Sequence, residues 1–229
     1  MRFTILKPFR NFSAANQNHR NMKNILYLLC LLPVFSEVAA QVTPDTSAKQ
    51  TKNFFQLTIN GKNYTIAENE PLKLDGSFLN PTILVKTAAY KLFDNNALSF
   101  RYPKEFSFAA EKSPNYKNWS LNGNDVVLLV FELDAVITLD ALLDEMIKRF
   151  GKQNCSTEDF DGKLGEVASK GKKLFVTLAG EKLLYECYEI KLNDGKSRFI
   201  YFQDNYTTGK HTEEFTKAFA LVNSTFHAH

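Results

Sequence analysis

Cysteine and histidine, which often serve as nucleophiles, bases or metal ligands, are few after position 40: two cysteines and three histidines. A cysteine attacks as its thiolate, which a neighbouring imidazole usually generates. Cys155, Cys187 and His211 are the obvious candidates, so a hydrolase would need a cleft that joins His211 to a cysteine or a carboxylate. His227 and His229 could chelate a metal together, but chain ends usually fray, so we expect a disordered tail there. No spacing matches a nucleophile elbow, a metalloprotease helix, a phosphate-binding loop or a paired-cysteine metal site. We therefore expect no catalytic residue, no cofactor and no metal.

An acidic stretch over residues 158–166 partly matches a calcium-binding loop. Aligning Gly162 with the invariant glycine of that loop puts Thr157 and Ala168 where the first and last carboxylates are needed. Two essential ligands are therefore missing. We expect a solvated hairpin between Phe160 and Leu164 instead.

Residues 22–40 are typical of a cleavable secretory signal peptide. A basic start is followed by an apolar run over residues 25–35 and by small residues that end at Ala40, the predicted cleavage site. The run is shorter than the roughly 20 residues that a membrane helix needs. We predict an exported protein of the periplasm or the extracellular space, with no transmembrane segment after cleavage. Residues 1–21 are either an extended start of the leader or lie upstream of a true start at Met22.

Export bears on the two cysteines that remain after cleavage. In an oxidising compartment, Cys155 and Cys187 are candidates for a disulfide. The alternative is two free thiols, one of them buried among apolar neighbours. Sequence spacing does not fix the geometry that a disulfide requires, so both alternatives stay open.

Charge and length limit the partners and the number of domains. The leader removes five of the 28 basic and one of the 25 acidic residues, which leaves 23 against 24. A nearly neutral chain lacks the concentrated positive charge that nucleic-acid binding requires. The remaining length suits one domain. The 20 Phe and nine Tyr of the whole sequence indicate a protein rich in β-strands.

Turn signals and alternating apolar residues define the expected elements. Residues 41–52 are polar and predict a flexible tether. Residues 53–97 predict a hairpin region with a turn at Asn60-Gly61. The predicted strands share short apolar runs bounded by turn residues, and they cover residues 82–93, 98–102, 106–110, 116–121, 126–133, 174–178, 183–192 and 198–203.

The predicted fold depends on residues 126–133, which are apolar on both faces of a strand. Such a strand needs cover on each side. Two amphipathic helices, at 138–150 with Thr138 as its N-cap and at 213–223 with Thr212 as its N-cap, fit that need. The sequence therefore predicts an α+β fold, a mostly antiparallel β-sheet covered by helices on both faces, as an α/β/α sandwich.

The order of these motifs resembles the PsbP-like fold family, which includes an extrinsic subunit of photosystem II, a eukaryotic Ran-GTPase release factor and bacterial envelope proteins such as DcrB. The resemblance covers residues 98–226 and leaves residues 53–97 outside. It is carried by Leu-Ser-Phe-Arg-Tyr-Pro at 98–103, the strand at 126–133, the helix after Thr138, and Val-Asn-Ser-Thr-Phe at 222–226. It implies a non-catalytic binding or assembly module whose partner differs between members.

Three functions remain as hypotheses. The first is an exported, non-enzymatic binding or assembly module of the bacterial envelope, whose partner is another envelope protein bound at a face or edge of the sheet. The second is a carrier of a small apolar ligand held between sheet and helix by Phe199, Tyr201 and Phe219. The third is a hydrolase built around His211.

Overall fold

The computed structural model describes Thr43, Pro44 and residues 51–229. The predicted signal peptide at residues 22–40 lies outside the described residues. Within the described part of the chain, no helix has the length and apolar character needed to cross a membrane.

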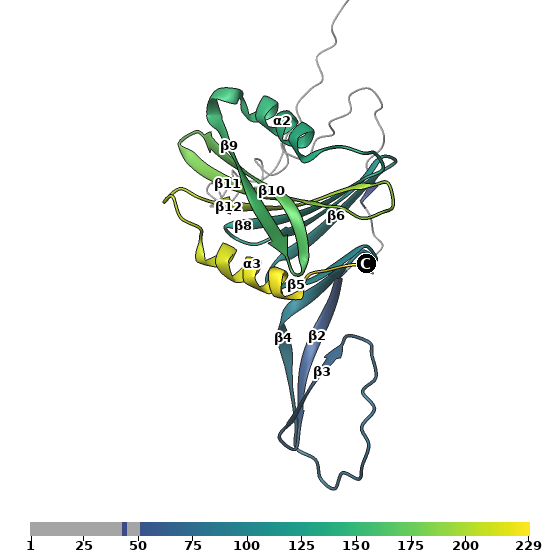
Figure 1. The fold of residues 1–229 in the computed structure, drawn as a ribbon. Coiled ribbons are helices and arrows are strands. Elements are labelled where there is room, and N and C mark those ends of the chain that lie inside the picture. The colour runs from purple at the N-terminus through teal and green to yellow at the C-terminus, as the bar shows by residue number, and fades with distance from the viewer. Residues whose placement is uncertain (1–42, 45–50) are drawn as a thin grey trace, which may run out of the picture. The chain divides into compact units, whose positions relative to one another are not determined.

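Most of the described residues belong to two antiparallel sheets (Figure 1). The larger, sheet A, has eight strands in the order β1 (Thr43–Pro44), β6 (Ser107–Ser113), β7 (Tyr116–Asn122), β8 (Val126–Leu133), β12 (Ser197–Asn205), β11 (Glu181–Ile190), β10 (Val167–Leu178) and β9 (Cys155–Leu164). The smaller, sheet B, has five in the order β13 (His227–Ala228), β5 (Leu98–Pro103), β4 (Ile83–Asp94), β2 (Thr51–Ile59) and β3 (Lys62–Ala67).

Strand β8 lies inside sheet A between β7 and β12, and the sequence predicted its bounds. Its side chains alternate between the two faces of the sheet. Val126, Leu128 and Val130 point into the main core, whereas Val127 and Leu129 are buried on the opposite face. The prediction of a strand apolar on both faces is therefore confirmed.

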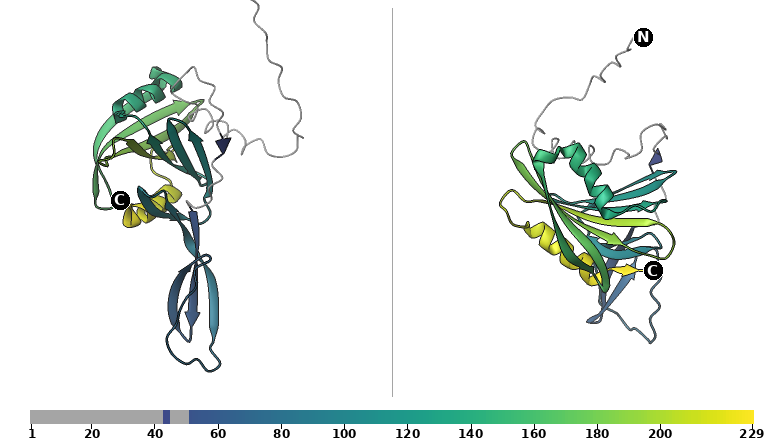
Figure 2. Two further views of the ribbon diagram at one scale, coloured as in Figure 1. Left: turned by 90° about the vertical axis from the view of Figure 1, so that its right-hand side faces the viewer. Right: turned by 45° about the horizontal axis from the view of Figure 1, so that its top comes forward.

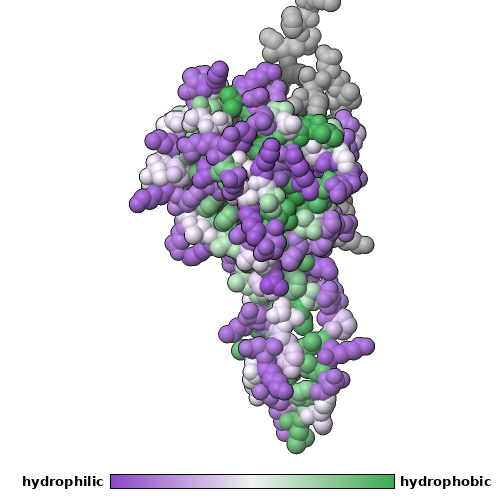
Figure 3. Space-filling view, in the orientation of Figure 1, coloured by the Kyte–Doolittle hydropathy of each residue, from purple (hydrophilic) through white to green (hydrophobic). Residues whose placement is uncertain are grey.

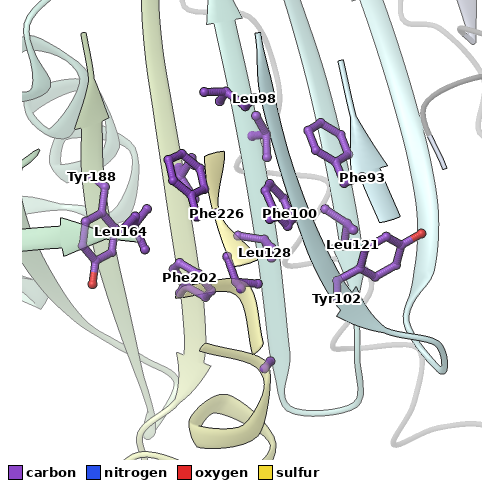
Figure 4. Close-up of a cluster of buried hydrophobic side chains, with 14 of the residues drawn as sticks. Phe93, Leu98, Phe100, Tyr102, Leu121, Leu128, Leu164, Tyr188, Phe202 and Phe226 are labelled. Atoms are coloured by element: carbon purple, nitrogen blue, oxygen red, sulfur yellow. The ribbon is translucent and has the colours of Figure 1, made fainter. Parts of the chain in front are cut away.

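The main core lies between one face of sheet A and a cover built from two kinds of element. Helix α3 (Glu213–Thr225) contributes Phe215, which packs edge to face on Phe202 of β12 at 5.9 Å between ring centroids. Sheet B contributes Phe93, which meets Trp119 of β7 at 5.8 Å. Figure 4 shows this cluster of buried side chains drawn from both sheets and the C-terminal segment.

The opposite face of sheet A carries helix α2 (Leu139–Phe150), which is followed by the short 3₁₀ helix η2 (Lys152–Asn154). Phe150 of α2 contacts Tyr185 of β11 at 5.8 Å between ring centroids, and Asp140 pairs with Lys172 of β10 at 2.8 Å. Figures 1 and 2 show α2 and α3 on different sides of sheet A.

The predicted α/β/α sandwich is wrong. Strands account for 55% of the described residues and the helices for 16%, and the strands form two curled sheets. The physical reason is one of area. A 13-residue helix is about 20 Å long, whereas eight strands spaced about 4.8 Å apart span more than 30 Å. One helix cannot cover a face of that width, and α3 shares its face with β4 and β5.

Local signals placed both helices correctly. The Thr138 hydroxyl accepts a hydrogen bond from the Ala141 amide at 3.2 Å, and the Thr212 hydroxyl accepts one from the Phe215 amide at 3.1 Å. Both are N-cap bonds that satisfy a donor which the helix itself leaves free. Helix α3 runs to Thr225, two residues beyond the prediction.

Two glycine turns had different outcomes. Asn60 and Gly61 both have positive φ angles, 47° and 80°, and close the predicted hairpin between β2 and β3. The hairpin predicted between Phe160 and Leu164 is wrong, because Gly162 lies inside β9 and the turn comes after Leu164. A Cβ on Gly162 would lie 2.9 Å from the Tyr188 ring, so this glycine serves close packing.

Candidate functional site

Strand β4 extends beyond the strand that pairs with its outer edge. Its pairing with β5 covers only Tyr90 to Asp94, although β4 begins at Ile83. Strand β5 ends at Pro103, which has no backbone N–H with which to continue the ladder. Among the described residues, the backbone of residues 83–88 therefore has β2 on one side and no partner strand on the other. We call this stretch the open edge.

The open edge carries apolar side chains that face solvent. Ile83 is 57% exposed, Leu84 48% and Val85 56%. Scattered exposed apolar residues are ordinary, but three consecutive ones along the open edge of a strand are not. Figure 3 shows hydrophobic surface over the part of sheet B that β2, β3 and β4 form. The arrangement is suited to pairing with another extended chain.

A second cluster surrounds His211, at the start of helix α3. Its Nδ1 lies 2.9 Å from an oxygen of the fully buried Asp204, and its Nε2 lies 3.3 Å from Glu186. The imidazole ring stacks on Phe215 at 3.9 Å between centroids. The two carboxylates lie beside different nitrogens of the imidazole ring, so these three groups cannot coordinate one metal ion together.

The carboxylates of this cluster are also engaged with other groups. Asp204 accepts hydrogen bonds from the Thr212 hydroxyl at 2.6 Å and the Thr212 amide at 3.1 Å. Glu186 pairs with Lys173 at 3.1 Å. These contacts tie the first turn of α3 to β11 and β12, which is a structural task. The structure thus joins His211 to two carboxylates.

Cys155 and Cys187 are free thiols. Cys155 lies opposite Val176 of β10, whereas Cys187 lies opposite Lys172, four residues further along that strand. Four residues correspond to about 13 Å, too far for a disulfide. Cys187 also follows Glu186 directly on β11, so its side chain points to the face of the sheet opposite to the His211 cluster.

Neither thiol is activated for nucleophilic attack. Burial, reinforced by the charge of Glu186, raises the pKa of the Cys187 thiol well above its ordinary value. Burial also raises the pKa of Cys155. Both shifts disfavour the thiolate that nucleophilic catalysis needs.

The three residues predicted to hold an apolar ligand do not come together. Phe199 and Tyr201 point to the face of sheet A that carries α2, whereas Phe219 packs on Tyr188 and Phe202 on the other face. The Tyr201 hydroxyl and the Asn118 side-chain oxygen are both buried and have no hydrogen-bond partner in the part of the chain that the structure describes. Alternation along the strands places them on the same face of the sheet.

A polar cleft of about 550 Å³ opens beside the start of α2. Its charged lining residues are Asp140, Asp159, Asp161, Lys170, Lys172, Glu189 and Lys191. Lys172 bonds to Asp140 and Asp159, and these hydrogen bonds raise its pKa. The charges therefore satisfy one another in part. Among the described residues, no group of three or more His, Cys, Asp or Glu side chains is arranged to hold a metal ion.

The predicted disordered C-terminal tail is wrong. His227 and Ala228 form β13, which pairs with Ser99 and Leu98 of β5. The His229 ring nitrogen lies 3.0 Å from the Ser99 hydroxyl, and the His229 amide donates to the carbonyl of Ala97 at 2.9 Å. The two imidazoles of the possible chelating pair are thus parts of a sheet edge.

A scan against protein-family models found no match, and a search against curated proteins also found none. Membership of the PsbP-like family therefore stays a prediction.

Sequence reasoning identified the strand that forms the open edge but missed that its edge is open. The signal that could have revealed it is the run Ile-Leu-Val-Lys-Thr at 83–87, combined with a following strand that proline ends early. The sequence singles out His211, but the link of this residue to Asp204 and Glu186 depends on strands brought together by the fold.

Proposed function

We propose that the protein is an exported, non-enzymatic binding or assembly module that joins a protein partner through the open edge of β4. The observation that carries this proposal is the exposure of Ile83, Leu84 and Val85, each about half accessible, on a strand with one unpaired side. In strand addition, backbone hydrogen bonds supply affinity and alternate side chains supply specificity. The open edge offers both.

The contacts of His211 and the raised pKa values of the two cysteine thiols favour a binding protein over a hydrolase. Both ring nitrogens of His211 face carboxylates, and one of these, Asp204, also holds the first turn of α3. Both nitrogens of the imidazole are therefore engaged with neighbouring carboxylates. The thiols of Cys155 and Cys187 have raised pKa values and are poor nucleophiles at neutral pH.

Site-specific photo-cross-linking in producing cells tests the proposal. A photo-reactive amino acid at Leu84 is expected to yield a discrete cross-linked species of higher mass. The same amino acid at Lys163, an exposed position on β9, is the matched control and is expected to give no discrete species. Equal or absent cross-linking at the two positions would overturn the proposal.

A second candidate function, a carrier of a small ligand, is favoured by one observation. On the face of sheet A that carries α2, the Tyr201 hydroxyl and the Asn118 oxygen are buried without partners among the described residues, and orphaned buried polar groups are costly. A bound molecule with an apolar body and polar atoms would satisfy them. Native mass spectrometry of the protein purified without denaturation tests this, because bare protein alone would exclude a retained ligand.

A further inference from the structure

We infer that the partner at the open edge is a second copy of this chain, whose β4 pairs antiparallel with the first β4 about a two-fold axis. The inference rests on the proposed function and names the partner for that same edge. Two-fold pairing is the commonest way in which identical chains associate, and it requires a surface complementary to itself. The sequence and the limits of the open edge meet that requirement.

The first argument is the fit of length. When Val85 lies opposite Val85 of the second copy, residues 82–88 pair with residues 88–82. The open edge stops at Ala88, because the Ala89 carbonyl accepts from the Lys104 amide and β5 pairs with β4 from Tyr90 onward; Tyr90 would then lie opposite Asn80. Asn80 has a φ of 51° and precedes Pro81, so it lies outside β4, which begins at Ile83. Strand β5 of each copy thus begins beyond the other copy's β4, and the two do not compete for the same space.

The second argument is charge. Lys86 is the one charged residue of the segment 82–88. In the register centred on Val85, Lys86 lies opposite Leu84 of the second copy, so the two lysines are diagonal neighbours and no like charges lie directly opposite each other. Centring the pair on Lys86 would set two lysines opposite each other, which is destabilising. Centring it on Leu84 would bring Pro81 into the ladder, where it has no N–H to donate. The register centred on Val85 is therefore favoured.

The third argument is the apolar face that this register completes. Ile83 and Val85 lie on the same face of β4 as each other, and Ile59 and Leu57 of β2 lie directly opposite them. Two-fold pairing places the corresponding four residues of the second copy beside them. One continuous apolar stripe across four strands results, and side chains that meet across the two copies, such as the two Val85, each lose part of their exposure to water.

Sedimentation of the full chain, purified after export, tests the inference across a concentration series. We expect a reversible monomer–dimer equilibrium. Val85→Glu places two carboxylates opposite each other at the two-fold axis and is expected to weaken dimerisation by at least about tenfold. Val136→Glu, the same change at an 85% exposed valine in the loop before α2, is the control and is expected to leave the dimer unchanged. Circular dichroism checks that both variants remain folded.

Cysteine cross-linking tests the register itself. In a Cys155→Ser background, Val85→Cys is expected to give a disulfide-linked dimer under mild oxidation, because the introduced thiols face each other. Lys86→Cys is expected to give far less, because its thiol faces Leu84 of the second copy. Preferential linkage by Lys86→Cys would overturn the register, and no linkage by either variant would overturn the pairing.

The outcomes separate this inference from the proposed function. A protein that stays monomeric at all concentrations, but cross-links through position 84 in cells to a species of another mass, refutes the second copy and leaves the proposed function standing. A monomer that gives no cross-link from position 84 refutes both. A dimer that Val85→Glu leaves intact places the interface elsewhere and also overturns the inference.

Discussion

Asp204 offers the sharpest test of how the structure is held together, because its carboxylate is fully buried at the junction of β12 and α3. It accepts hydrogen bonds from the Thr212 hydroxyl at 2.6 Å, the Thr212 amide at 3.1 Å and the His211 ring at 2.9 Å. Asp204→Ala removes all three acceptor contacts while leaving the donors in place. An unsatisfied buried donor costs more than the net value of the bond it has lost.

The magnitude follows from the exposure of the donors. The side chain of His211 is 29% exposed, so water can replace its contact and that loss is small. The two Thr212 donors are only partly buried, and each orphaned donor costs about 1–2 kcal/mol. We expect Asp204→Ala to lower the free energy of unfolding by about 3 kcal/mol.

Urea denaturation followed by circular dichroism measures this loss. With a slope of roughly 2 kcal/mol per molar urea, the midpoint should fall by about 1.5 M. Asp144→Ala, on the exposed side of α2, is the matched control and should change stability by less than about 0.5 kcal/mol. Asp204→Asn keeps an acceptor and should fall between the two. A loss below about 1 kcal/mol for Asp204→Ala would refute the reasoning that this carboxylate anchors α3.

Three further predictions concern packing, pH and thiol reactivity. Gly171→Ala puts a Cβ into the ring of Phe160, so thermal denaturation should show a loss of about 1–3 kcal/mol that Phe160→Leu in the same chain partly restores. Burial raises the pKa of Glu132, but hydrogen bonds and ion pairs with neighbouring lysine and arginine residues outweigh it and hold the pKa below the ordinary 4.5. This carboxylate therefore stabilises the fold above pH 4.5 and stops doing so as the pH falls through its lowered pKa; urea midpoints should show a smaller acid-induced decline in Glu132→Gln. Cys187, fully buried, should react with a thiol reagent only after unfolding, whereas Cys155 should react slowly in the folded protein; fast modification of both would contradict the buried geometry.

Local chemistry made several parts of the fold predictable. Thr138 and Thr212 begin the two helices because a hydroxyl can satisfy a free amide one turn ahead, and that bond depends on neighbours in the chain. Asn60 and Gly61 close a hairpin because both tolerate positive φ. The strand at 126–133 was predictable because a short apolar run bounded by turn residues is typical of a strand buried on both faces.

Contacts between segments that are far apart in the sequence were not predicted. The pair Asp161-Gly162 predicts a turn, although the ring of Tyr188, two strands away in sheet A, requires a glycine there. The position of His227 and His229 at the chain end predicts a tail, although β5, more than a hundred residues earlier, offers an edge for them to join. Spacing left the cysteine pair open because strand register alone sets the separation of the two thiols.

The sequence by itself determined the positions of the helices and most strands, because caps, turns and apolar alternation are properties of residues a few positions apart. The tertiary structure alone decided that the strands form two sheets, that His211 meets Asp204 and Glu186, and that residues 83–88 keep one side unpaired. Strand pairing joins backbone groups that all residues except proline share, so the choice of partner strand leaves little trace in the order of the side chains.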